Sequence, residues 1–101
     1  MKMAIVRKHA MSLADVTEQP HFKFSSFRVR GRIFVTVPPG EELIHVLVGE
    51  EDRERALAMY PEWAEKLPWG GKVVGLRVRL QAAVPAAVKS LVLKAYEAKA
   101  R

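Results

Sequence analysis

The segment KVVGLRVRL, residues 72–80, alternates its side chains with the period of two that defines a β-strand. One face receives Val74, Leu76, Val78 and Leu80, and the other receives Val73, Arg77 and Arg79. Such a strand is half-buried with a basic outer face, so another layer must cover its apolar face. Residues 84–101 supply that layer, because apolar side chains recur there at helical spacing after Pro85. The two segments predict a helix packed on a sheet.

The remaining segments extend this pattern. We expect a helix from Met3 to about Leu13, a hairpin at 26–37, a strand at 43–48 inside the sheet, an acidic helix that begins at 50 and stops at Pro61, and a short edge segment within 62–71. The predicted order is α-β-β-β-α-(β)-β-α. It describes an α+β domain with an antiparallel sheet of five to six strands flanked by three helices. No linker or internal repeat divides the chain, so residues 1–101 are expected to form one domain.

The hairpin SFRVRGRIFVTV, residues 26–37, has a side-chain pattern that depends on its turn. With Arg30-Gly31 as a two-residue turn, Arg28 would lie opposite Ile33, and both faces would mix charge with apolar groups. A three-residue loop instead places Phe27, Ile33, Val35 and Val37 on one face and Arg28, Phe34 and Thr36 on the other. We therefore expect the odd loop, in which Gly31 supplies a positive φ.

The net charge of +6 is distributed unevenly. Residues 1–40 hold seven Lys/Arg against two acids, residues 41–65 hold two against eight, and residues 66–101 hold eight against one. A basic excess attracts nucleic acid or another anionic surface. The alternative is that the charge serves solubility alone.

Composition and apolar runs exclude several classes of protein. Cysteine is absent, which excludes disulfides, thiol catalysis and thiolate metal sites. Asparagine is absent too, a pattern seen in proteins from hot environments. No apolar run reaches the roughly 18 residues that span a bilayer. The N-terminal stretch carries charge within its apolar part, unlike a signal peptide, so a cytoplasmic location is expected.

Six segments follow one another in an order found in a family of small domains. They are AMSLADVTEQPHF, SFRVRGRIFVTV, EELIHVLV, PEWAEKL, PWGGKVVGLRVRL and KSLVLKAYEAKA. As a set they resemble the MmcQ/YjbR family over nearly the whole chain, through hydrophobic, aromatic and glycine positions rather than a catalytic signature. The chain departs from the family at Ala14-Asp15, where many relatives have Pro-Gly.

This resemblance implies a YjbR-like α+β domain that binds DNA through two β-hairpins acting as wings. Carried over by position, the candidate nucleic-acid-binding residues are Arg28, Arg30 and Arg32 on one wing and Lys72, Arg77 and Arg79 on or beside the other. The family offers no catalytic residues to transfer. Arg30 and Arg32 flank a glycine turn where the fold does not require charge, so this tip is the stronger candidate for contact.

The chemistry of arginine agrees with this expectation, because its planar fork matches phosphate oxygens and base edges. Aromatic Phe34 or Trp69 nearby could stack on a base. The alternative is that these arginines keep a sheet face wet, pair with acids from residues 41–65 and protect strand edges. Under either interpretation we expect a monomer rather than a stable oligomer.

A protein-interaction domain and an enzyme are the two other classes of function to compare with the sequence. A protein-interaction domain would use the acidic helix, an apolar sheet face, or Trp63 and Trp69 as anchors, although tryptophans in so small a domain more often fill the core. An enzyme is the weakest option, because His9, His21 and His45 are scattered and the serines lack a GxSxG motif. We therefore expect no catalytic residue, no metal site and no cofactor.

Overall fold

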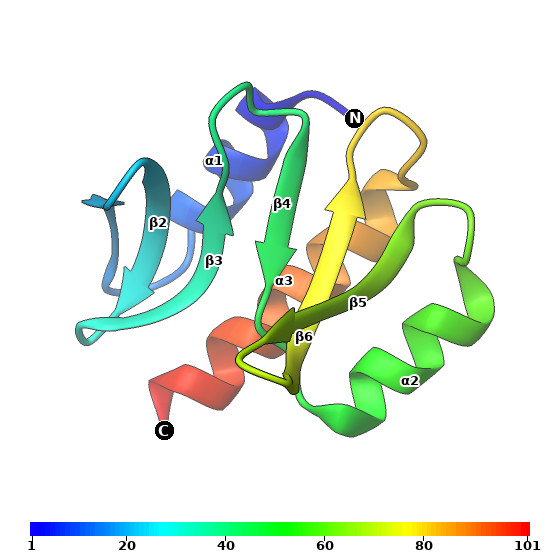
Figure 1. The fold of residues 1–101 in the computed structure, drawn as a ribbon. Helices are drawn as coiled ribbons and strands as arrows, with labels where there is room; N and C mark the ends of the chain where they lie inside the picture. The colour runs from blue at the N-terminus through cyan, green and yellow to red at the C-terminus, as the bar shows by residue number, and fades with distance from the viewer.

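The computed structural model describes all residues from 1 to 101, which form three helices and one six-stranded antiparallel sheet (Figure 1). In chain order the elements are α1 Met3–Met11, β1 Val16–His21, β2 Phe24–Val29, β3 Arg32–Val37, β4 Leu43–Val46, α2 Glu50–Met59, β5 Ala64–Trp69, β6 Lys72–Arg79 and α3 Pro85–Ala100. Across the sheet the strands follow the order β1-β2-β3-β4-β6-β5. The expected α+β class is confirmed, and β4 lies inside the sheet as predicted.

One face of the sheet is covered by helices. In Figure 1, α1 and α3 lie behind the strands, α2 lies beside β5 and β6, and no helix lies in front of β2, β3, β4 or β6. The positions whose spacing predicted α3 are all buried: Val88, Leu91, Val92 and Ala95. On the strands, the fully buried apolar side chains of the same core include Ile44, Val46, Leu76 and Val78. The helical stripe and the alternating strand therefore share one core, as the sequence predicts.

Strand β1 adds an element that the predicted order does not contain. It pairs along its whole length with β2, from Val16 opposite Val29 to His21 opposite Phe24. Pro20 belongs to this strand, and a strand can tolerate a proline there because β1 is an outer strand with one unpaired edge. The preceding turn contains Asp15, a non-glycine residue with a left-handed φ of 63°.

The predicted three-residue loop between β2 and β3 is wrong. Arg30 and Gly31 form a two-residue turn in which both residues have a left-handed φ, 53° and 77°. Such a turn matches the right-handed twist of the flanking strands. Arg28 consequently lies opposite Ile33, which is the pairing that the sequence argument rejected.

A β-bulge restores the expected burial of Phe27, Val35 and Val37, but not the places expected for Ile33 and Phe34. Phe34 is fully buried in the core against Tyr96 of α3, so the expectation that it stacks on a base is wrong. The register shifts between Phe27 and Arg28, so that Phe27 pairs with Val35 and both are fully buried. A bulge inserts one extra residue on one strand and changes which face the following side chains occupy. The extra residue is Phe34 of β3, which lies between the partners of Phe27 and Arg28, so the change of parity is inside β3 and not in the loop.

The backbone at the end of β4 lies directly against Gly75 of β6. A Cβ atom built on this glycine would overlap the carbonyl oxygen of Val46 and lie 3.0 Å from the Cα of Leu47. The chain leaves β4 at this point, and the Leu47 amide donates to the carbonyl of Phe34 in β3 at 3.0 Å. Gly75 is thus required by close packing of backbone against backbone.

Candidate nucleic-acid interface

The turn between β2 and β3 presents Arg30 to solvent. Its φ of 53° is a backbone conformation that costs an L-residue on the order of 1 kcal/mol relative to glycine. The Arg30 side chain is exposed, and no hydrogen bond or ion pair involves it, unlike Arg28 and Arg32 on either side. Its guanidinium therefore has all five donors available for a ligand.

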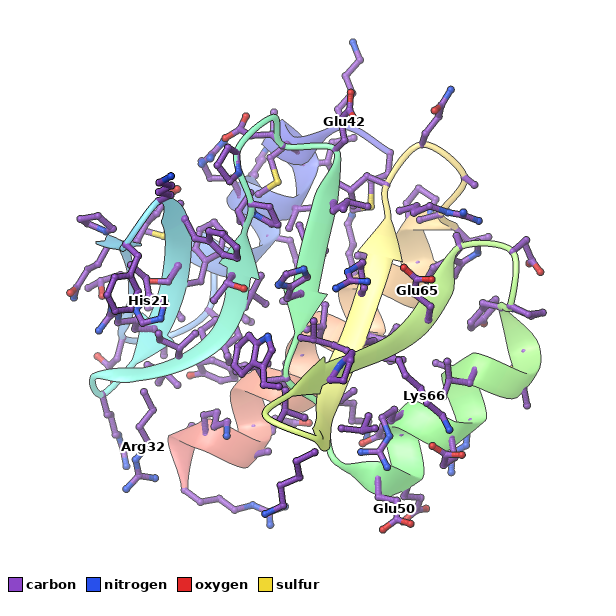
Figure 2. The ribbon with its side chains drawn as sticks, viewed as in Figure 1. His21, Arg32, Glu42, Glu50, Glu65 and Lys66 are labelled. Carbon is purple, nitrogen blue, oxygen red and sulfur yellow. The ribbon has the colours of Figure 1, made fainter.

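Arg32, two residues further on, contacts the end of α3. Its Nη1 donates to the carbonyl oxygens of Arg101 at 2.8 Å and Lys99 at 3.3 Å. These carbonyls carry the negative end of the helix dipole, where a cation is favoured. The contact holds the β2–β3 hairpin beside the C-terminus of α3 and adds the charges of Lys99 and Arg101 to that of Arg32, which Figure 2 labels.

The second hairpin, β5–β6, turns at Gly70 and Gly71, whose φ values are 58° and 80°. Lys72 follows the turn, is exposed and takes part in no hydrogen bond or ion pair. In Figure 1 the β2–β3 turn, the C-terminus of α3 and the β5–β6 turn all lie at the lower end of the domain. The fold thus brings Arg30, Arg32 and Lys72 to one end.

The other three predicted residues lie along strands and have partners within the chain. Arg28 donates to Ser26 Oγ at 3.0 Å and to the Pro20 carbonyl at 3.3 Å, Arg77 pairs with Glu65 at 3.3 Å, and Arg79 donates to the Glu62 carbonyl. The Arg77–Glu65 pair is largely exposed, so its net contribution to stability is small. Arg28, Arg77 and Arg79 would have to exchange or share these contacts to bind a ligand.

The face without helices carries a row of rings from three strands. Phe24 of β2 and Trp69 of β5 lie on either side of His45 of β4, with ring centroids 5.8 Å and 6.5 Å from the imidazole. His45 Nδ1 lies 3.2 Å from the hydroxyl of Thr36. Burial lowers the pKa of His45, and the positive charge of Arg77 lowers it further. The sequence offered one signal for this row, because His45 is the polar residue in the apolar strand LIHVLV.

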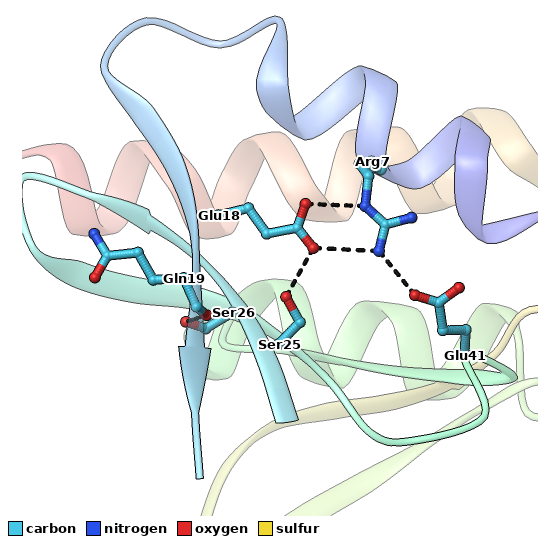
Figure 3. Close-up of polar contacts among 6 residues, drawn as sticks. All are labelled: Arg7, Glu18, Gln19, Ser25, Ser26 and Glu41. Atoms are coloured by element: carbon cyan, nitrogen blue, oxygen red, sulfur yellow. Dashed lines mark hydrogen bonds and ion pairs between the residues drawn. The ribbon is translucent and has the colours of Figure 1, made fainter. Parts of the chain in front are cut away.

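A polar network that sequence reasoning missed joins α1 to the sheet (Figure 3). Arg7 of α1 binds both carboxylate oxygens of Glu18 at 2.9 Å and 3.2 Å and one of Glu41 at 2.8 Å, while Ser25 donates to Glu18 at 2.7 Å. Burial raises the pKa of Glu18, but the hydrogen bonds from Arg7 and Ser25 outweigh it, and the net pKa is lowered. Its hydrogen bonds to Glu18 and Glu41 raise the pKa of Arg7. The network fastens β1 and the β3–β4 loop to α1.

The acidic residues of segment 41–65 are concentrated on α2, where some of them form ion pairs with an arginine of the same helix. Arg55 pairs with Glu51 at 3.2 Å and with Asp52 at 3.6 Å, both on the same helix. Among the six predicted residues, only Arg77 pairs with a carboxylate from residues 41–65. The alternative interpretation, in which the candidate arginines pair with the acids of residues 41–65, therefore holds for one of the six residues, Arg77.

No group of three or more His, Asp or Glu side chains lies close enough together to hold a metal ion. None of the three helices combines the length and the apolar character that crossing a membrane requires.

Comparison with known proteins gives one result. The family model of YjbR matches residues 11–98, from the last residue of α1 to the last turns of α3, and so includes both hairpins and the whole sheet. No curated protein matches the chain.

Proposed function

Because the chain belongs to the YjbR family, we propose that it is a non-catalytic DNA-binding protein whose two basic hairpins contact the phosphate backbone as wings. The observation that carries this proposal is the pair of exposed, unpartnered cations at the two hairpin turns, Arg30 and Lys72, at the same end of the domain (Figure 1). The proposal includes the cytoplasmic location expected from the sequence.

Electrostatics favours phosphate as the ligand of this end. Arg32 contacts the backbone oxygens of Lys99 and Arg101, and in Figure 1 the end of α3 that carries them lies at the same end of the domain as both turns. Neutralising phosphates with such side chains releases condensed counterions, which gives affinity that falls as salt rises. Arg30 and Lys72 need break no internal contact to take part. We therefore expect them to contribute more than Arg77 and Arg79, which already have partners.

The test is a salt titration with a labelled 20-bp DNA duplex followed by fluorescence anisotropy. The double variant Arg30→Ser, Lys72→Ser should bind more weakly, and its slope of log K against log salt should be smaller by about 2. The matched control is Lys8→Ser, Lys89→Ser, which removes the same charge from exposed lysines on α1 and α3. This control should retain nearly the full slope, because it lies away from the turns.

A third variant compares the contribution of the arginines on the strands to DNA binding with that of the cations at the turns. Arg77→Ser with Arg79→Ser should also weaken binding, but less than the double change at the turns, since both arginines have partners within the chain. Absence of any complex between the parent protein and the duplex at low salt would sink the proposal. An equal loss in the turn variant and in the lysine control would show that only total charge matters.

For the alternative function, a protein-interaction domain, the positions of the two tryptophans limit which side chains could anchor a partner. Trp63 is 1% exposed and belongs to the core, so it cannot anchor a partner. Trp69 and Met59 remain as exposed apolar side chains, on β5 and on α2. Light scattering at several concentrations should find the expected monomer, and capture of a protein partner that resists nuclease treatment would favour the alternative.

A further inference from the structure

The open face of the sheet, defined as the face opposite α1 and α3, has no covering helix (Figure 1). Phe24, His45 and Trp69 lie side by side across it, and the Trp69 side chain is 44% exposed. His45, by contrast, is buried beneath its neighbours. Leu67 is also buried, but outside the main hydrophobic core. The apolar lining of this face is therefore separate from the core under the helices.

Phe22, at the turn between β1 and β2, combines two unfavourable features. Its side chain is 94% exposed, and its φ of 59° is left-handed, which is a rare conformation for a bulky residue. Its ring forms a T-shaped pair with the ring of His21, at a centroid distance of 4.8 Å. His21 pairs with Phe24 across the strands, and Figure 2 labels it on the open face. Strain and full exposure at one aromatic residue indicate a ligand that uses the ring.

The charges around these rings select the kind of ligand. Lys23 follows Phe22 in the turn and is exposed, Arg28 lies on β2, and Arg77 follows His45 across the sheet as its partner in β6. The acid among them, Glu65, forms a largely exposed pair with Arg77. Rings separated by cations complement a chain that carries flat bases and regularly spaced phosphates. An apolar protein partner would leave these cations without counter-charges.

We propose that the open face binds single-stranded nucleic acid by base stacking. The stacking rings are Trp69, Phe24 and Phe22, and the phosphate-binding cations are Lys23, Arg28 and Arg77. A duplex cannot stack on these rings, because its bases are stacked on each other and their faces are not available. The inference rests on the proposed nucleic-acid binding but assigns the rings of the open face as the binding groups and a different strand state, single rather than double.

The test compares three labelled probes by fluorescence anisotropy: dT20, rU20 and a 20-bp duplex. Trp69→Ala and Phe22→Ser should each weaken binding of dT20 by about 10-fold, as expected for loss of one stacked base. Binding of the duplex should not change in either variant. The control Met59→Ser removes an exposed apolar side chain of α2 and should alter neither affinity. Equal affinity for rU20 and dT20 would show that stacking, and not the 2′-hydroxyl, governs binding.

Intrinsic fluorescence gives a second readout that a merely structural role would not produce. Trp63 is buried and Trp69 is exposed, so quenching on addition of unlabelled dT20 reports on Trp69. Trp69→Phe should keep most of the affinity, because it keeps a stacking ring, but it should lose the quenching. Phe22→Ser changes a residue that is almost entirely exposed, so loss of folding cannot explain its effect.

The possible outcomes separate this inference from the hairpin proposal. If the parent protein and the variants Trp69→Ala and Phe22→Ser all bind dT20 with equal affinity, the stacking proposal is overturned. This holds even when the duplex still binds. If dT20 binds with quenching and the duplex does not bind, the hairpin proposal fails and stacking stands. If no probe binds, both fail. Self-association of the parent that Phe22→Ser abolishes, without any response to nucleic acid, would identify the face as a contact between copies and overturn stacking.

Discussion

Substitution of Gly75 by alanine places a methyl group where the backbone of β4 already lies. The new Cβ would overlap the Val46 carbonyl oxygen and lie 3.0 Å from the Cα of Leu47, and neither atom belongs to a flexible side chain. The strands must therefore separate at this point. Because β4 and β6 both lie inside the sheet, the displacement cannot be absorbed at an edge.

The size of the effect follows from what separation disrupts. Overpacking a well-packed site costs about 1–3 kcal/mol, and weakening a neighbouring ladder hydrogen bond, such as one in the Val46–Leu76 pairing, adds about 1 kcal/mol. We expect Gly75→Ala to lower the free energy of unfolding by about 3 kcal/mol, which at about 4–8 °C per kcal/mol for a domain of this size lowers Tm by roughly 12–24 °C.

Thermal denaturation followed by circular dichroism measures this loss directly. The matched control is Gly49→Ala, because a Cβ at Gly49 meets nothing within 4 Å and its φ of −72° suits any residue. Gly49 precedes α2 as its N-cap, so the control should cost at most about 1 kcal/mol. A Tm for Gly75→Ala close to that of the control would refute the argument that backbone proximity requires glycine.

Two other substitutions test strain and charge. Phe22→Asn should raise Tm by a few degrees, because asparagine tolerates a left-handed φ that costs other residues about 1–2 kcal/mol; a lower Tm would contradict the strain argument. Glu18→Gln should destabilise the protein at neutral pH by removing the ion pair with Arg7. Since the pKa of Glu18 is lowered on folding from 4.5, its contribution is present above pH 4.5 and is lost as pH falls through the folded pKa. Urea titrations should therefore find parent and variant converging below that pH, and a constant difference would disprove the linkage.

The layered architecture was predictable because it depends on periodicity. The alternation in β6 and the helical repeat in α3 each specify a buried face, and the two faces meet in one core, where Leu76 and Val88 are both fully buried. Strand β1 was not predicted, because VTEQPH has little apolar content and contains Pro20. Its place at the edge of the sheet makes both properties acceptable, and edge position is decided by the whole sheet rather than by the segment.

The face of the sheet that each side chain of the β2–β3 hairpin occupies could not be predicted from the local sequence either. Burial of Phe27 was expected and is observed, but the sequence cannot distinguish an extra residue in the loop from an extra residue in the strand. The structure has the extra residue in β3, at Phe34, opposite Phe27 and Arg28. A left-handed Arg30 in place of the usual Asn or Asp then completes the turn.

The candidate site was predictable in composition but not in arrangement. The sequence identified six basic residues on two hairpins, yet it could not show that Arg32 would contact the end of α3, 67 residues away at Lys99. It also could not separate Arg30 and Lys72, which have no partners, from Arg77, whose acid comes from the neighbouring strand. The sequence did not identify Phe22 as a candidate, because the exposure of its side chain and its backbone conformation are known only from the structure.

The two outer strands of the sheet share a feature with a consequence for assembly. β1 contains Pro20 and β5 contains Pro68, and a proline has no backbone N–H to offer to an additional strand. β5 also has a register irregularity next to its proline. Such edges resist lengthening of the sheet by a strand from another chain, which is the usual route to fibrils and to edge-paired dimers. Contacts with any partner are therefore expected through side chains on the open face or at the hairpin turns, and not through backbone pairing.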